Sequence, residues 1–152
     1  MKLTALNADA AQIDPASGKV HALGIGAQTT TTPLPPLALI IIIDLEPSEE
    51  FGKSSSIRGM LHSADTGKPF LIDGERPFGF STPAPTGGSD RAVLTLSFTG
   101  GITIDPGNYY WEVEITETPE KVRIPMQVLG PDIDETADAS LEAGEDSQLS
   151  PR

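Results

Sequence analysis

The 152-residue sequence predicts an all-β fold, an antiparallel β-sandwich of about eight strands. Apolar and polar residues alternate with a period of two in several segments, as in strands with one buried and one exposed face. Turn formers are frequent, with 14 prolines and 15 glycines, which favours short strands over long helices. The candidate strands recur about every ten residues, a spacing typical of a sandwich or a barrel.

The clearest element is a closing hairpin over Gly107–Leu129. Its first strand places the chain's only tryptophan, Trp111, on an apolar face, and Tyr110, Glu112 and Glu114 on a polar face. Its second strand repeats the alternation. Tyr110 is the one aromatic residue on the polar side, so we expect it to contact a partner if that face meets one.

The chain begins with two strand-like segments, Lys2–Ala8 and Lys19–Gln28. The turn formers Asp14, Pro15 and Gly18 lie between them. We therefore predict a first hairpin made of these two segments. Many of its residues are small, which allows close packing within the chain or against a neighbouring subunit.

A second strand region follows a proline-rich connector. Thr29–Thr32 is expected to be extended, and Leu37–Leu45 is apolar on both faces, so it predicts a central strand that is covered on both sides. If the chain itself buries only one of these faces, the isoleucines of the other, Ile40 and Ile42, would form an interaction surface with another subunit.

The middle of the chain contains shorter candidates. Glu46–Ser55 is polar and predicts a loop, and Ile57–His62 alternates as a strand does. Further strands are expected at Lys68–Ile72, Phe78–Thr82 and Ala92–Thr99, with a loop at Pro83–Asp90 and with Leu94, Leu96 and Phe98 facing inward.

The charge is unevenly distributed. Residues 131–152 contain seven acidic residues and one basic residue, which is half of the net charge of −12. Few hydrophobic residues occur there, so we predict a sandwich domain over residues 1–130 and a disordered acidic tail over residues 131–152. The alternative is a short helix over Glu135–Ala143 that forms on a partner.

The composition argues against several classes of partner. An acidic chain without a cluster of Lys or Arg repels phosphate backbones and anionic membrane surfaces, so we expect neither nucleic acid nor membrane as a partner. The longest apolar run, Leu37–Ile43, is much shorter than the roughly 20 residues of a membrane helix. The chain has no cysteine, which is compatible with a reducing cytosol. We expect a cytoplasmic protein, or a virion protein if a phage encodes it.

No constellation of catalytic residues is evident. The only two histidines, His21 and His62, would need a carboxylate such as Asp44 to hold a metal ion. This set gives one alternative, a metal-dependent hydrolase. The acidic residues near Glu46 give another, a calcium-binding site. Because no G-x-S-x-G or phosphate-loop pattern is complete, we predict a protein that is not an enzyme, with no catalytic residue, no metal site and no cofactor.

Three segments carry a resemblance to known proteins. They are L-T-A-L-N-A-D-A-A-Q-I-D near the start, T-T-P-L-P-P-L-A-L-I-I-I-I-D in the middle, and P-G-N-Y-Y-W-E-V-E-I in the closing hairpin. Together they resemble a family of small uncharacterised bacterial and phage-encoded proteins, described only as a domain of unknown function, which implies no activity. The last segment is also similar to a strand of immunoglobulin-like domains, so the expected sandwich is immunoglobulin-like.

These observations favour a non-enzymatic module that acts by protein association, either with itself or within a larger complex. The predicted interaction surface comprises Ile40, Ile42, Tyr110, Glu112 and Glu114. The resemblance suggests a second function, a structural component of a phage virion located on the capsid surface or the tail. The metal-dependent hydrolase is the third.

Overall fold

The computed structural model describes residues 1–26, 29–46, 54–85 and 90–131, and these residues form strands and no helix. The strands, in chain order, are β1 (Lys2–Ala8), β2 (Ala10–Ile13), β3 (Val20–Leu23), β4 (Thr29–Thr31), β5 (Leu37–Asp44), β6 (Ser56–Ser63), β7 (Leu71–Ile72), β8 (Arg76–Pro77), β9 (Gly79–Pro83), β10 (Arg91–Phe98), β11 (Gly107–Ile115) and β12 (Lys121–Leu129). The all-β prediction is therefore confirmed.

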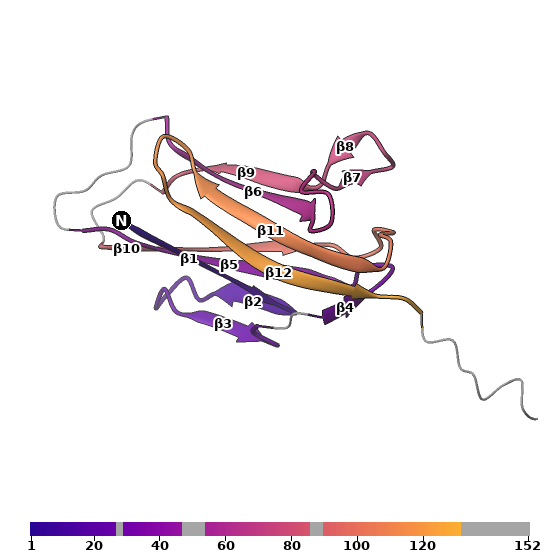
Figure 1. Cartoon of the computed structure of the whole chain (residues 1–152). Helices are drawn as coiled ribbons and strands as arrows, with labels where there is room; N and C mark the ends of the chain where they lie inside the picture. The colour runs from indigo at the N-terminus through magenta and orange to yellow at the C-terminus, as the bar shows by residue number, and fades with distance from the viewer. Residues whose placement is uncertain (27–28, 47–53, 86–89, 132–152) are drawn as a thin grey trace, which may run out of the picture.

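Two larger sheets face each other (Figure 1). One has three strands in the order β1-β5-β10, and the other has five in the order β4-β12-β11-β6-β9 and is curled like half of a barrel. The hairpin β2-β3 lies against the outer side of the three-stranded sheet, and β7-β8 forms a small separate ribbon.

The hydrophobic core lies between the two sheets. Trp111 from β11 is fully buried, and the rings of Phe78 and Phe98 each lie 5.2 Å from it, centroid to centroid. The apolar face of the closing hairpin contributes Val113, Ile115, Ile124, Met126 and Val128, and the three-stranded sheet contributes Leu3, Ala5, Leu39, Ile41 and Ile43. The alternation in the sequence predicted the buried face of both strands of the closing hairpin.

Strand β5 is the central strand of its sheet, as its double-sided apolar pattern predicted. Leu39, Ile41 and Ile43 face the core and are fully buried. On the opposite side, Ile40 is only 3% exposed and Ile42 is half-buried, because the β2-β3 hairpin packs over β5 and β10. The chain itself therefore covers most of the second face.

The first hairpin differs from the prediction. Lys2–Ala8 does not pair with Lys19–Gln28; it pairs antiparallel with β5 over its full length. The hairpin is formed by β2 and β3, which pair from Ala10–Leu23 to Ile13–Val20 around the predicted turn. The chain bends at Asp9, whose N–H donates to Leu23 O at 2.9 Å, so one continuous run of small residues is divided between two sheets.

Two further expectations need correction. Thr29–Thr31 joins the sheet parallel to β12, because the chain crosses from one sheet to the other before it, so the domain is not purely antiparallel. The predicted strand Lys68–Ile72 is a strand only at its end, in β7, and Pro69 forms an isolated bridge to His62. The short strands raise the number in the described residues from the predicted eight to twelve.

Three predicted segments lie wholly or partly outside the described residues. These are the acidic tail beyond Pro131, most of the loop Glu46–Ser55, and part of the loop Pro83–Asp90.

The two lateral sides of the molecule differ. On one side β1 packs against β12 of the other sheet, and the core-facing side chains of β1, Leu3 and Ala5, are each only 8% exposed. On the other side the edge strands are β10 and β9, and Leu94, Leu96 and Phe80 remain half-buried. We call these the closed side and the open side.

Candidate functional site

The most structured polar surface is the exterior of the five-stranded sheet. We call it the outer face and define it by Arg58, Met60 and His62 of β6, Tyr110, Glu112 and Glu114 of β11, and Lys121 and Arg123 of β12. These residues occupy the alternate positions of strands whose remaining positions fill the core. The pairing register of β6, β11 and β12 then places them in adjacent rows.

Tyr110 is held from two directions. Its ring stacks on the ring of His62, with centroids 5.2 Å apart and planes 5° from parallel. The Arg123 guanidinium lies 4.6 Å from the centre of the Tyr110 ring, which is a cation–π contact. His62 is itself oriented by Met60, because His62 Nδ1 lies 3.2 Å from Met60 O. Tyr110 is therefore a fixed, half-buried aromatic group on a polar surface.

Glu112 links the two strands of the closing hairpin. Its Oε1 lies 3.1 Å from Lys121 Nζ and its Oε2 accepts a hydrogen bond of 2.9 Å from Arg123 Nε. Burial disfavours the charged carboxylate, but the hydrogen bonds from Lys121 and Arg123 outweigh it, so the pKa of Glu112 is lowered. Because Arg123 is bound by Glu112, it is held in position over Tyr110.

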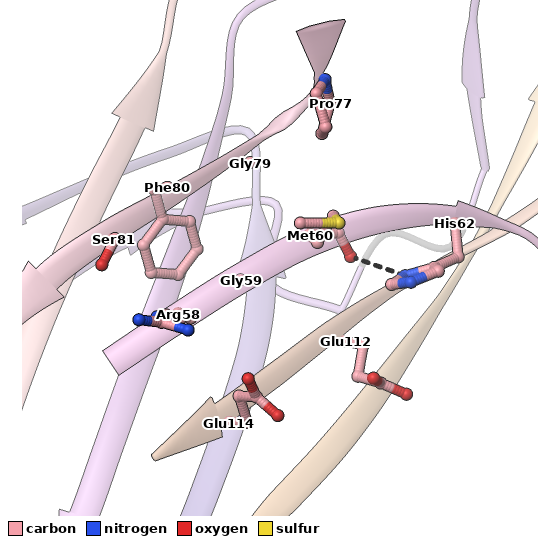
Figure 2. Close-up of a pocket in the computed structure, with 10 residues that line it drawn as sticks. All are labelled: Arg58, Gly59, Met60, His62, Pro77, Gly79, Phe80, Ser81, Glu112 and Glu114. Atoms are coloured by element: carbon pink, nitrogen blue, oxygen red, sulfur yellow. Dashed lines mark hydrogen bonds between the residues drawn. The ribbon is translucent and has the colours of Figure 1, made fainter. Parts of the chain in front are cut away.

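A pocket of about 530 Å³ lies beside this cluster, between β6, β9 and β11. Figure 2 shows Arg58, Met60 and His62 following one another along β6, with Glu112 and Glu114 on the neighbouring strand. Pro77, Gly79 and Ser81 line the β9 side. The pocket thus combines one cation, two carboxylates, a thioether and an imidazole.

Gly59 allows the neighbouring Phe80 ring to lie against the sheet. The ring packs against the core, 6.2 Å from the Phe98 ring, and occupies the space that a Cβ at position 59 would need. A side chain at Gly59 would therefore push the ring away from the sheet, and glycine is required here for the close approach of the ring rather than for its backbone angles.

The charges on the outer face are not fully paired. Glu112 binds two cations, and Glu114 Oε2 lies 3.7 Å from Lys121 Nζ. Arg58 is exposed and forms no ion pair with any described residue, although Glu114 is its neighbour across the strands. Arg58 is therefore available to an anionic group of a ligand.

The residues proposed for a metal site are far apart in the fold. His21 lies on β3 of the small hairpin sheet, His62 lies on the five-stranded sheet, and Asp44 on β5 binds Arg91. Within residues 1–26, 29–46, 54–85 and 90–131, no group of three His, Cys, Asp or Glu residues is placed to hold a metal ion.

The structure brings together three of the five predicted surface residues. Tyr110, Glu112 and Glu114 share the outer face, whereas Ile40 and Ile42 lie on the other sheet, where the hairpin leaves Ile40 almost no surface. The surface also contains four residues that were not predicted to belong to it: Arg58, Met60, His62 and Arg123. Their alternation was visible, but the pairing of β6 with β11 was not.

A smaller apolar surface occurs on the β2-β3 hairpin. Leu23 is 72% exposed and Ile25 is 57% exposed. A second pocket of about 580 Å³ lies on this hairpin and is lined by three alanines together with Gln12, Val20, His21 and Leu23. It offers fewer polar groups to orient a ligand than the outer face does.

No family model matches the chain, and no curated protein matches it. The described residues also contain no helix that is long and apolar enough to cross a membrane.

Proposed function

We propose that this protein is a non-enzymatic association module that binds a partner protein through its outer face. The observation that carries the proposal is the placement of Tyr110 between the His62 ring and the Arg123 guanidinium, beside a pocket. Interface residues that dominate binding are enriched in Tyr and Arg and lie in rigid, well-packed surroundings. Tyr110 meets each of these conditions.

The rigidity of this cluster favours binding. A partner that contacts Tyr110 does not have to restrict its rotation, because His62, Arg123 and Glu112 already do so. The entropy cost of ordering an interface side chain is about 0.5–1.5 kcal/mol for each mobile group.

The outer face also indicates the chemistry of the partner. Arg58 favours a carboxylate of the partner, and the thioether of Met60 adapts to an apolar side chain that enters the pocket. Because both signs of charge occur on this face, the partner surface is expected to be mixed in charge rather than strongly basic. A protein segment fits this description better than a nucleic acid does.

We infer in addition that the two facing sheets form an immunoglobulin-like sandwich. The P-G-N-Y-Y-W-E-V segment supports this, together with the fully buried Trp111 at the centre of the core. The immunoglobulin-like topology is a proposal about fold and does not by itself support any function.

Site-specific photo-crosslinking tests the proposed function. A photoreactive phenylalanine analogue at position 60, on the outer face, is compared in cells with the same analogue at position 12, which is exposed on β2. We expect a specific crosslinked protein from position 60 only, and we expect Tyr110→Ala to abolish it while Gln12→Ala leaves it unchanged. No product from position 60, or the same products from both positions, would contradict the proposal.

The identity of the crosslinked protein also distinguishes the two association hypotheses. A capsid or tail protein would assign the chain to a virion, as the family resemblance suggests. A cellular protein would place it in a non-viral complex.

A further inference from the structure

We propose that two copies of this chain associate by pairing their β10 strands antiparallel across a two-fold axis, which joins two three-stranded sheets into one continuous sheet. This inference concerns a different sheet from the outer face and does not rest on the proposed function. The outer face belongs to the five-stranded sheet, whereas β10 is an edge of the other one.

The first step is the direction of the backbone groups of β10. Leu45 N–H donates to Asp90 O at 2.8 Å, and β10 continues antiparallel to β5 from Arg91↔Asp44 to Phe98↔Leu37. Hydrogen-bonded pairs alternate along such a ladder, so every second residue directs its N–H and C=O toward β5. The residues that direct these groups away from the sheet are Arg91, Val93, Thr95 and Ser97.

The outward groups of three of these residues are available for pairing. The backbone N–H and C=O groups of Val93, Thr95 and Ser97 form no hydrogen bond with any described residue. A row of such groups along an eight-residue strand is a template for a further strand.

The second step is a comparison of the four edges of the two sheets. Strand β4 has only three residues, β9 ends in Pro83 and follows Pro77, and β1 packs against β12. Short length, proline and coverage are the usual means of protecting an edge from pairing. Strand β10 is eight residues long, contains neither proline nor glycine, and has no strand beyond it among the residues that the structure describes.

The third step is the side chains that the edge leaves exposed. Leu94 and Leu96 face the core but remain only half-buried, whereas their neighbours on β5, Ile41 and Leu39, are fully buried. A strand added to β10 would cover them in the same way that β10 covers β5. The open edge is therefore apolar as well as rich in unpaired backbone groups.

The absence of charge on the central part of β10 favours a second copy as the source of the added strand. The chain carries a net charge of −12, so most of its surfaces repel another copy. No charged residue occurs from Ala92 to Thr99, so two copies can meet there without opposing like charges.

One register pairs the outward residues at the centre of the strand. If the two-fold axis passes beside Leu94, Val93 pairs with the second copy's Thr95, and Ser97 lies opposite its Arg91. Leu94 then faces Leu94 of the second copy in a non-hydrogen-bonded pair, with Cα atoms about 4.5 Å apart. That separation is within the range of a disulfide bond.

Hydrogen exchange of the full chain tests the strand pairing directly. The amides of Leu94 and Leu96 donate toward β5 and should be protected at every protein concentration. The amides of Val93 and Thr95 should gain protection as the concentration rises through the range in which sedimentation detects a species of twice the 16.0 kDa chain mass. A protein that stays monomeric up to about 1 mM, or a dimer without new protection on β10, would overturn the proposal.

Two substitutions at position 95 test whether the outer edge of β10 forms the dimer. Thr95→Pro removes an outward N–H that β5 does not use, so it should weaken dimerisation at least about 30-fold while the monomer stays folded. Thr95→Val keeps the N–H and should dimerise normally. Retained dimerisation in a folded Thr95→Pro protein would overturn the proposal.

Because the chain has no cysteine, one introduced thiol is an unambiguous reporter even if the proline variant does not fold. Leu94→Cys should form a disulfide-linked dimer on oxidation, whereas Ser97→Cys, which faces Arg91 in the proposed register, should not. The reverse result would overturn the register. Tyr110→Ala should leave self-association unchanged, so failure of the outer-face proposal and failure of this one are distinguishable.

Discussion

The closed and open sides of the molecule are built from the same kinds of strands but differ in how completely their core-facing residues are buried. On the closed side, β1 continues into contact with β12, and its core-facing residues are almost completely buried. On the open side, the core-facing residues of β10 remain half-buried, and the aromatic rings of Phe80 and Phe98, with centroids 6.2 Å apart, extend across the gap between the sheets. The comparison shows that equally good strand patterns do not ensure equal burial, because burial depends on what the second sheet places opposite each strand.

The largest expected effect comes from truncating one leucine on each side. Leu3→Ala on β1 should lower the free energy of unfolding by about 2–4 kcal/mol, because it leaves a cavity in closed packing. Leu94→Ala on β10 should cost about 1–2 kcal/mol, because its side chain is already partly in water. Urea unfolding at a concentration at which the protein is monomeric measures both values. Equal costs would show that the two sides are packed alike.

The next largest effect concerns the ring that narrows the open side. Gly59→Ala should lower the free energy of unfolding by about 1–3 kcal/mol, because the new methyl group displaces the Phe80 ring from the sheet. The double variant Gly59→Ala/Phe80→Ala should lose less than the sum of the two single changes, since without the ring there is no overlap to relieve. Additive losses in thermal or urea unfolding would argue against this contact.

The smallest expected effect involves charges on the outer face, which belongs to neither the closed side nor the open side. Glu112→Gln should lower the melting temperature at pH 7 by less than about 4 °C, because Lys121 and Arg123 are largely solvated and such pairs contribute little. Arg123→Lys serves as a control that keeps the charge on β12. If Glu112→Gln destabilised the protein more than Leu94→Ala does, the outer face rather than the core would limit stability.

The pH dependence of this pair has a definite sign. Folding lowers the pKa of Glu112, so its contribution to stability is present above the carboxyl pKa of the unfolded chain, about 4.3, and is lost as the pH falls through the lower pKa of the folded state. The stability difference between wild type and Glu112→Gln should therefore shrink as the pH falls below about 5. A difference that stays constant as the pH falls would contradict a charge-based origin.

The local alternation of apolar and polar residues was sufficient to predict the closing hairpin. Alternation over Gly107–Leu129 correctly predicted two paired strands, the burial of Trp111 and the placement of Tyr110 on a polar face. The central position of β5 was also predictable, because only a strand covered on both sides tolerates apolar residues at every position.

Pairing over long sequence distances was not predictable in the same way. Lys2–Ala8 has no local feature that distinguishes pairing with β3 from pairing with β5, and the bend at Asp9 depends on a hydrogen bond to Leu23. The outer face had the same difficulty, because the stacking of Tyr110 on His62 requires the register of β11 against β6.

The amino-acid pattern thus determined which segments become strands and which of their faces are apolar, since both follow from the two-residue period of an extended backbone. Only the tertiary structure decided which strands are neighbours, which edge remains open and which polar side chains converge, since these depend on loop paths and on the packing of one sheet against another. The outer face around Tyr110 and the unpaired edge of β10 are both products of that second step.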